Sequence, residues 1–168
     1  FYIMLATMMI PSQAIIIANY LTIADWGIRN TYAALILPNA AAAFAVFNMR
    51  QAFLTLPKEI HEAAEIDGAT GVNAFFSITI PLLSPTIFFV LVTRVIGSLQ
   101  VFDLIYMVID KSNPALTKTQ SLVYLFYKYA FINKNMGYGA TIVVVLLIIT
   151  MILTVFQMIG QKKWVFYN

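Results

Sequence analysis

The sequence contains no cysteine. This absence excludes disulfide bonds, thiolate metal sites and cysteine nucleophiles together. The chain also has no run of basic residues, and its formal net charge is only +3. A nucleic-acid-binding role therefore has no support, because proteins of that class carry clustered Lys and Arg.

Charged residues are scarce as well. They make up 10% of the chain, whereas hydrophobic residues make up 61%. Ordinary globular domains carry about 25% charged residues. A soluble chain of 168 residues has too much surface for its volume to hide this apolar excess from water. We therefore expect lipid to be the solvent for much of the surface.

Long apolar runs are present instead. Four stretches contain no Asp, Glu, Lys or Arg, and each reaches the roughly 20 residues that a helix needs to cross about 30 Å of hydrocarbon. Strand-like alternation is absent, and a helix satisfies every backbone group in lipid. The sequence predicts four transmembrane helices, over residues 1–23, 32–54, 76–99 and 139–160.

Because successive spans alternate in direction, the segments between them fall into two groups. Residues 23–31 and 110–138 are predicted to lie on one side of the membrane, and residues 55–75 and the tail after residue 160 on the other. Lys and Arg are nearly evenly divided between the two groups. The positive-inside rule therefore does not identify the cytoplasmic side.

The segment of residues 55–75 contains more than a simple turn. Pro57 suits the first turn of a helix, Glu59 in that turn favours the helix dipole, and Gly68 ends the helix. Thr70 is predicted to cap a second helix. The first helix fits either a plug for the groove of another protein or a plain connecting helix at the membrane surface.

The two faces of this short helix are predicted to differ. Small and apolar side chains line one face and carboxylates the other, because helical neighbours recur three and four positions apart. The first face comprises Ile60, Ala63, Ala64 and Asp67, and the second Glu59, Glu62 and Ile66.

Several motifs resemble those of bacterial ABC-importer permeases. The Glu-Ala-Ala motif of that family is matched by Glu62-Ala63-Ala64, followed by Ile66-Asp67-Gly68-Ala69, a form similar to the carbohydrate-uptake branch. Further resemblance lies in Arg50-Gln51-Ala52-Phe53, in residues 96–106 and in Met136-Gly137-Tyr138-Gly139. The chain departs from the family at Ile80, where leucine is usual, and at Ser112-Asn113, where Gly-Gly is usual.

The resemblance implies an all-α, polytopic transmembrane helical bundle of the MetI-like ABC importer permease fold. Residues 1–168 would form one permease domain, N-terminally incomplete, with residues 55–75 as a cytoplasmic coupling loop. The implied location is the bacterial cell membrane, with lipid around the spans. The implied contacts to the ATP-binding cassette subunit are made by Glu62, Ala63, Ala64, Ile66, Asp67 and Gly68.

The implied function is the import of sugars or oligosaccharides. A second permease subunit and an extracytoplasmic sugar-binding protein are the other implied partners. ATP would be bound and hydrolysed by the partner subunit, so this chain is expected to be no enzyme and to hold no cofactor. The absence of a glycine-rich phosphate loop agrees with that expectation.

A mixture of polar and aromatic residues follows the third predicted span. Sugar recognition needs planar polar groups for the hydroxyls and aromatic faces for the C–H patch of the ring. The substrate-cavity candidates are Gln100, Phe102, Asp103 and Tyr106. In the resembling family this region borders the transport cavity. Arg94 is ionisable within the span, where a charge is costly, and lipid headgroups are the alternative to a functional role for it.

Two alternatives belong to other classes of protein. A channel or an ATP-independent secondary transporter would need ionisable pairs within the membrane, yet Arg94 and Asp103 are nine positions apart and fall on opposite faces of a helix. An intramembrane enzyme would need a nucleophile with its base or a metal set. His61 is the single histidine, so no metal site is expected.

Overall fold

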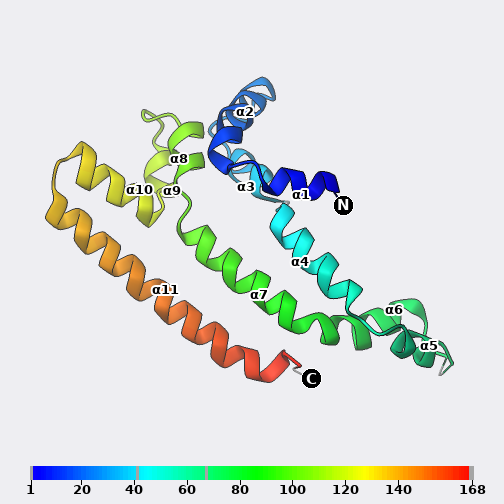
Figure 1. The fold of residues 1–168 in the computed structure, drawn as a ribbon. Coiled ribbons are helices and arrows are strands. Elements are labelled where there is room, and N and C mark those ends of the chain that lie inside the picture. The colour runs from blue at the N-terminus through cyan, green and yellow to red at the C-terminus, as the bar shows by residue number, and fades with distance from the viewer. Residues whose placement is uncertain (1, 41, 67, 167–168) are drawn as a thin grey trace.

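The computed structural model describes residues 2–40, 42–66 and 68–166. Within those ranges every regular element is a helix (Figure 1), which confirms the predicted all-α class. The elements are α1 Tyr2–Met8, α2 Ser12–Asp25, α3 Tyr32–Ala40, α4 Ala43–Leu54, α5 Lys58–Ile66, α6 Gly71–Ala74, the π-helical turn η1 Phe75–Thr79, α7 Ile80–Leu99, α8 Asp103–Val108, α9 Ala115–Thr119, α10 Leu122–Tyr127, the π-helical turn η2 Lys128–Ile132 and α11 Met136–Trp164.

Three helical stretches of the described chain are long and apolar enough to cross a membrane. They are Tyr32–Leu54, which contains α3 and α4 with an extended Ala42 before α4 and with residue 41 outside the described residues, Gly71–Leu99, which joins α6, η1 and α7, and Met136–Trp164, which is α11. Few of their side chains are buried within the chain. Apolar helices with this much free surface are stable where lipid or other membrane helices cover them.

The prediction of the first of the four spans is wrong. The run of residues 1–23 does not form one helix, because α1 ends at Met8 and α2 begins at Ser12. Pro11 separates them and directly precedes α2. A proline has no N–H for the preceding turn and forces the residue before it out of helical geometry. Neither piece has the length of a span.

The long helices α4, α7 and α11 form the lower part of the molecule (Figure 1). Here α7 packs between α4 and α11, and the colour gradient shows that it runs in the opposite direction to both. The shorter helices α2, α3, α8, α9 and α10 gather at the upper end, whereas α5 and α6 project from the lower end. The molecule therefore has two ends that differ in construction.

The buried core lies at the upper end. One cluster joins α8, α9 and α10, and a second joins α2, α3 and α8. The first comprises Ile105, Ile109, Leu116 and Tyr124, and the second comprises Ile23, Ala34 and Val108. Helix α8 contributes to both clusters and so ties the first part of the chain to the last.

Polar contacts hold the connection α2–α3 against the connection α8–α9. The guanidinium of Arg29 lies 2.6 Å from a carboxylate oxygen of Asp110. The side-chain amide of Asn30 donates to the other oxygen at 2.8 Å, and the Asp110 N–H donates to the Asn30 side-chain oxygen at 2.9 Å. The predicted grouping of residues 23–31 with residues 110–138 at one end is confirmed.

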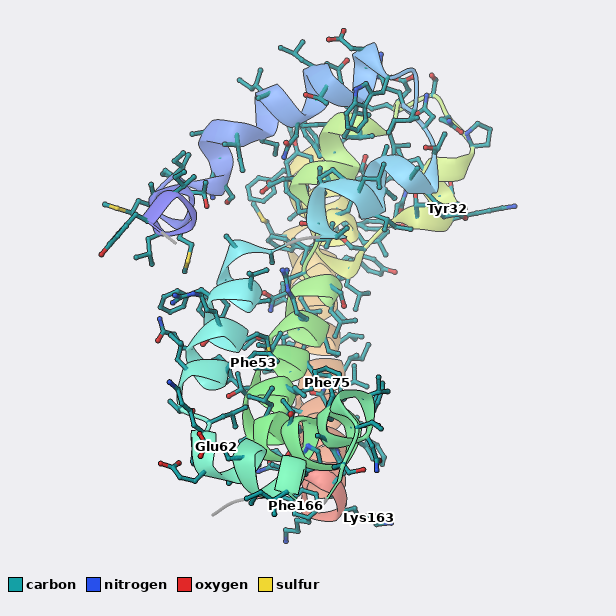
Figure 2. All side chains as sticks on the ribbon, turned by 90° about the vertical axis from the view of Figure 1, so that its right-hand side faces the viewer. Tyr32, Phe53, Glu62, Phe75, Lys163 and Phe166 are labelled. Carbon is teal, nitrogen blue, oxygen red and sulfur yellow. The ribbon has the colours of Figure 1, made fainter. Side chains whose placement is uncertain are left out.

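The C-terminal residues pack against the start of α7 at the other end. The N–H of Phe166 donates to the buried hydroxyl of Ser84 at 3.0 Å, and that hydroxyl donates to the carbonyl of Pro81 at 2.6 Å. Figure 2 shows Phe166 and Lys163 at the same end as Glu62 and Phe75, with Tyr32 at the opposite end. The predicted grouping of residues 55–75 with the tail is therefore confirmed.

Candidate functional site

The helix α5 has the bounds that the sequence predicts. It begins at Lys58, directly after Pro57, and Glu59 lies in its first turn. Gly68 follows with a φ of +76°, a left-handed conformation that glycine adopts without a steric penalty. Local sequence chemistry therefore fixes both ends of this short helix.

The two faces of α5 are only partly as predicted. Ala64 is 6% exposed and packs toward the rest of the chain, whereas Glu62 and Ala63 are exposed and Ile66 is 86% exposed. The sequence groups Ala63 and Ala64 on one face of small residues, whereas in the structure Ala64 packs against the chain and Ala63 is exposed. Neighbouring helical positions point about 100° apart, and the boundary between the packed and the free face passes between these two alanines.

Some predicted positions of this loop cannot be placed. Asp67 lies outside the described residues, and so do the side chains of His61 and Glu65. The exposed part of the coupling prediction therefore rests on Glu62, Ala63, Ile66 and Gly68.

The second helix of the loop continues directly into the membrane-spanning part. Thr70 caps α6, as predicted, because its hydroxyl accepts from the N–H of Asn73 at 3.4 Å. In the π-helical turn η1 the Ile80 N–H donates to the carbonyl of Phe75, five residues earlier. Such a wide turn accommodates Pro81, which cannot donate a backbone hydrogen bond. The helical stretch thus runs unbroken from Gly71 to Leu99.

A hollow lies at the base of this loop. Its volume is about 610 Å³, and it opens between the end of α4, the start of α5 and η1. Its walls are mainly apolar, and Lys58 is the charged residue among them. They comprise Phe53, Leu54, Leu56, Lys58, Ala69, Gly71, Ala74, Phe75 and Thr79. A projecting helix next to an apolar hollow is a surface suited to docking another protein.

A smaller pocket of about 280 Å³ lies at the upper end, and we call it the upper pocket. Polar side chains from three parts of the chain converge on it, as is usual for small-molecule sites. Its lining comprises Ser12, Ile15, Ile16 and Asn19 of α2, Pro38 and Asn39 of α3, and Gln100, Val101, Phe102, Asp103 and Leu104.

The upper pocket contains Gln100, Phe102 and Asp103 but not Tyr106 from the predicted substrate-cavity set. Sequence reasoning missed Ser12, Asn19 and Asn39. Their signal was present, because each is a polar residue inside an apolar run, and polar groups at membrane depth usually face a cavity or another helix.

Tyr106 belongs to an aromatic cluster beside the upper pocket. Its ring stacks on that of Phe102, with centroids 5.4 Å apart, and meets the ring of Tyr127 edge to face at 5.4 Å. The ammonium of Lys111 lies 5.3 Å from the centre of the Tyr106 ring. Phe102 is therefore the residue that joins the pocket to the cluster.

The hydroxyl of Tyr127 remains protonated at physiological pH. Its hydrogen bond with Tyr106 raises the pKa of Tyr127 above the ordinary value, and burial acts in the same direction. At this position the aromatic cluster therefore offers a neutral hydroxyl.

Arg94 and Asp103 do not form an ion pair in the described structure. Arg94 lies on α7, whereas Asp103 begins α8 after the intervening residues 100–102. Among the described residues the salt bridge is that of Arg29 with Asp110, away from the membrane-spanning part of α7. This geometry gives no ionisable pair of the kind that ion-driven carriers use.

Comparison with known proteins agrees with these features. The family described as binding-protein-dependent transport system inner membrane component matches residues 1–164. The sn-glycerol-3-phosphate transport system permease protein of Agrobacterium fabrum is 38% identical over 141 residues, which cover 80% of this chain and 47% of that protein. The arabinooligosaccharides transport system permease protein of Bacillus subtilis is 35% identical over 103 residues, which cover 61% of this chain and 33% of that protein.

A third relative carries a similar description. The sulfoquinovosyl glycerol transport system permease protein of Agrobacterium fabrum is 37% identical over 100 residues, which cover 60% of this chain and 32% of that protein. The chain thus spans about half the length, or less, of these curated relatives. No solved structure matches the chain.

The family match extends over nearly the whole chain, and the described helices include several that are long and apolar enough to span a bilayer. This chain is a multi-pass membrane protein and belongs to the family of binding-protein-dependent transport system inner membrane components.

Proposed function

We propose that this chain is the permease subunit of an ATP-driven importer of sugars or oligosaccharides. The observation that carries the proposal is the helix α5, which projects from the lower end and exposes Glu62, Ala63 and Ile66. A large aliphatic side chain that is 86% exposed at the tip of such a helix is suited to burial against a partner. The partner is an ATP-binding cassette subunit, which binds and hydrolyses ATP.

The path from that partner to the membrane is short and helical. Ala64 packs α5 against the chain, and the Ala69 N–H donates to the Ala64 carbonyl at 2.9 Å. Helix α6 then continues through η1 into α7. A partner that binds one position of α5 better than another would shift the arrangement of the spans by that difference in affinity.

The orientation and the remaining partners follow from the same proposal. The lower end, with α5 and the C-terminal tail, faces the cytoplasm, and the upper end faces an extracytoplasmic sugar-binding protein. A second permease subunit covers part of the free apolar surface of α4, α7 and α11. Solute passes the upper pocket, where Gln100, Phe102 and Asp103 contact it, and Tyr106 supports Phe102 from the aromatic cluster.

The solutes named in the descriptions of the relatives support this class of substrate. Glycerol phosphate, arabinooligosaccharides and sulfoquinovosyl glycerol, named for those relatives, all carry hydroxyl groups. The amides of the upper pocket match such groups because they donate and accept hydrogen bonds, and its carboxylate accepts them.

The test is the charge reversal Glu62→Lys in the complete transporter reconstituted into vesicles. We expect normal membrane insertion, and a fall of at least about tenfold in solute taken up per ATP hydrolysed, since one misplaced interface charge costs on the order of 1.4 kcal/mol or more. Asp25→Lys, an equal change in charge at the upper end, is the matched control and should leave this ratio unchanged.

Two results would count against the proposal. One is full coupling of uptake to ATP hydrolysis in the Glu62→Lys variant. The other is purification of an active transporter that contains no ATP-binding subunit, which would favour a carrier or channel instead.

A further inference from the structure

We infer that the upper pocket selects its solute by charge: it admits a neutral polyhydroxylated solute and disfavours an anionic one, with Asp103 as the selecting group. This inference rests on the proposed function, because it supposes that a transported solute reaches the pocket. A pocket of this kind would favour neutral sugars over phosphorylated solutes such as the one named for the relative from Agrobacterium fabrum.

The first argument is the sign of the charge in the pocket. Asp103 is the carboxylate of the lining, and the lining contains neither Lys nor Arg. Proteins bind phosphate and carboxylate groups chiefly with Arg, Lys and free helix N-termini. The N-terminal turn of α8 carries Asp103 itself, so its dipole is already matched by a negative charge.

The second argument is that two cations of the upper end, Arg29 and Lys111, contact groups that are not part of the pocket lining. Arg29 forms its salt bridge with Asp110 and lies over the ring of Tyr20, with 5.1 Å to the ring centre. The ammonium of Lys111 lies over the ring of Tyr106. Asp103 is exposed and lines the pocket, so an anionic solute bound there would lie close to its charge and be repelled by it.

The third argument is the match between the other lining groups and a sugar. The side-chain amides of Asn19, Asn39 and Gln100 both donate and accept hydrogen bonds. The Phe102 ring offers an apolar face for the C–H groups of a sugar ring. A volume of about 280 Å³ lies just below the usual range for ligand pockets, which suits a single sugar ring.

The charge of the pocket can be measured without transport. The chain has no cysteine, so Ser12→Cys places one reactive thiol in the wall of the pocket with little change in size. In the complete transporter we would compare its rate of reaction with a cationic and an anionic methanethiosulfonate of similar size. The parent transporter, treated in the same way, serves as the control for reaction at thiols of the partner subunits.

We expect the cationic reagent to react at least about tenfold faster than the anionic one, relative to their rates with a free thiol, because a nearby carboxylate attracts the first and repels the second. Adding Asp103→Asn should bring the ratio to that of the free thiol. Asp25→Asn, which removes a carboxylate of α2 outside the pocket lining, is the matched control and should leave the ratio unchanged.

Asn39→Cys on α3 serves as a second reporter, so a folding defect in one variant does not decide the result. A ratio that Asp103→Asn leaves unchanged at both positions would overturn the inference. So would a faster reaction with the anionic reagent in the parent background.

Uptake measurements distinguish this inference from the proposed function. With radiolabelled arabinose, maltose and glycerol 3-phosphate as probes, we expect ATP-dependent uptake of a neutral sugar, and a higher relative uptake of glycerol 3-phosphate in Asp103→Asn. Preferential uptake of glycerol 3-phosphate by the parent would overturn the inference while supporting an importer. Uptake that does not depend on ATP would contradict the proposed function, and the thiol rates would still test the charge of the pocket.

Discussion

Gly139 lies where α11 passes closest to η2. A Cβ atom added at this position would lie 2.9 Å from the Cβ of Ala130 and 3.3 Å from its Cα. Ala130 itself is buried. The two backbones therefore approach to a distance that tolerates no side chain at Gly139, and this contact fixes the hairpin between α10 and α11.

We expect Gly139→Ala to destabilise the protein by about 1–3 kcal/mol, the usual cost of overpacking a close contact. Gly160→Ala is the matched control on the same helix, because a Cβ there meets nothing within 4 Å, and alanine favours helix formation over glycine. Thermal unfolding in detergent measures both. Equal melting temperatures for the two variants would contradict the prediction, whereas recovery by Ala130→Gly in the Gly139→Ala background would support it.

Residues whose role is local were predictable from the sequence. Pro57, Gly68 and Thr70 act on their own turn, and the structure confirms where each begins, ends or caps a helix. The polar residues Ser12, Asn19 and Asn39 were not predicted as pocket residues. Their role depends on α2 and α3 meeting the start of α8, and residue spacing along one helix carries no information about that meeting.

The helix α5 is followed by Gly68, whose backbone conformation sets the direction of the chain after the helix. Gly68 has a φ of +76° but empty space where a Cβ would be, and Gly71 has empty space without the positive φ. Alanine at Gly68 would therefore strain the backbone without a steric clash, and alanine at Gly71 would cause neither.

We expect Gly68→Ala to lower the ratio of uptake to ATP hydrolysis by about fivefold or more, since a left-handed alanine costs roughly 1–2 kcal/mol and would displace α5 from its present position. Gly71→Ala should leave the ratio near that of the parent. Reconstituted vesicles provide the measurement. Identical ratios in the two variants would show that the conformation of Gly68 has no bearing on coupling.

The apolar runs of the sequence located three of the four predicted spans. The spans predicted at residues 32–54, 76–99 and 139–160 correspond to Tyr32–Leu54, Gly71–Leu99 and Met136–Trp164. The prediction of one helix over residues 1–23 was wrong because it rested on the length of the apolar run and not on the helix-breaking effect of Pro11. Pro81 and Pro85, in contrast, lie in a helix that stays continuous, since η1 widens the turn before Pro81.

On the scale of the whole molecule, its two ends present different chemistry. The lower end carries α5 and the tail, and the upper end carries the polar contacts of Arg29 with Asp110 and the upper pocket. This arrangement was predictable despite the error in the first span, because the alternation of direction depends only on the three helices that follow it.

We expect Ala63→Cys to react with a membrane-impermeant maleimide only in inside-out vesicles, and Asp25→Cys only in right-side-out vesicles, because the two residues lie on α5 and α2 at opposite ends. Because the chain has no native cysteine, its background labelling by the maleimide is low. Labelling of both positions from one side would contradict the arrangement of the spans.

The unbroken helical stretch Gly71–Leu99 has a mechanical consequence. At a rise of 1.5 Å per residue its 29 residues form a rod of about 43 Å. Pivoting such a rod by about 5° at its lower tip sweeps its upper tip through roughly 4 Å, a distance comparable to the width of a sugar ring. Gln100 follows that tip immediately and lines the upper pocket, so a small displacement near Thr70 becomes a larger displacement of one wall of the pocket.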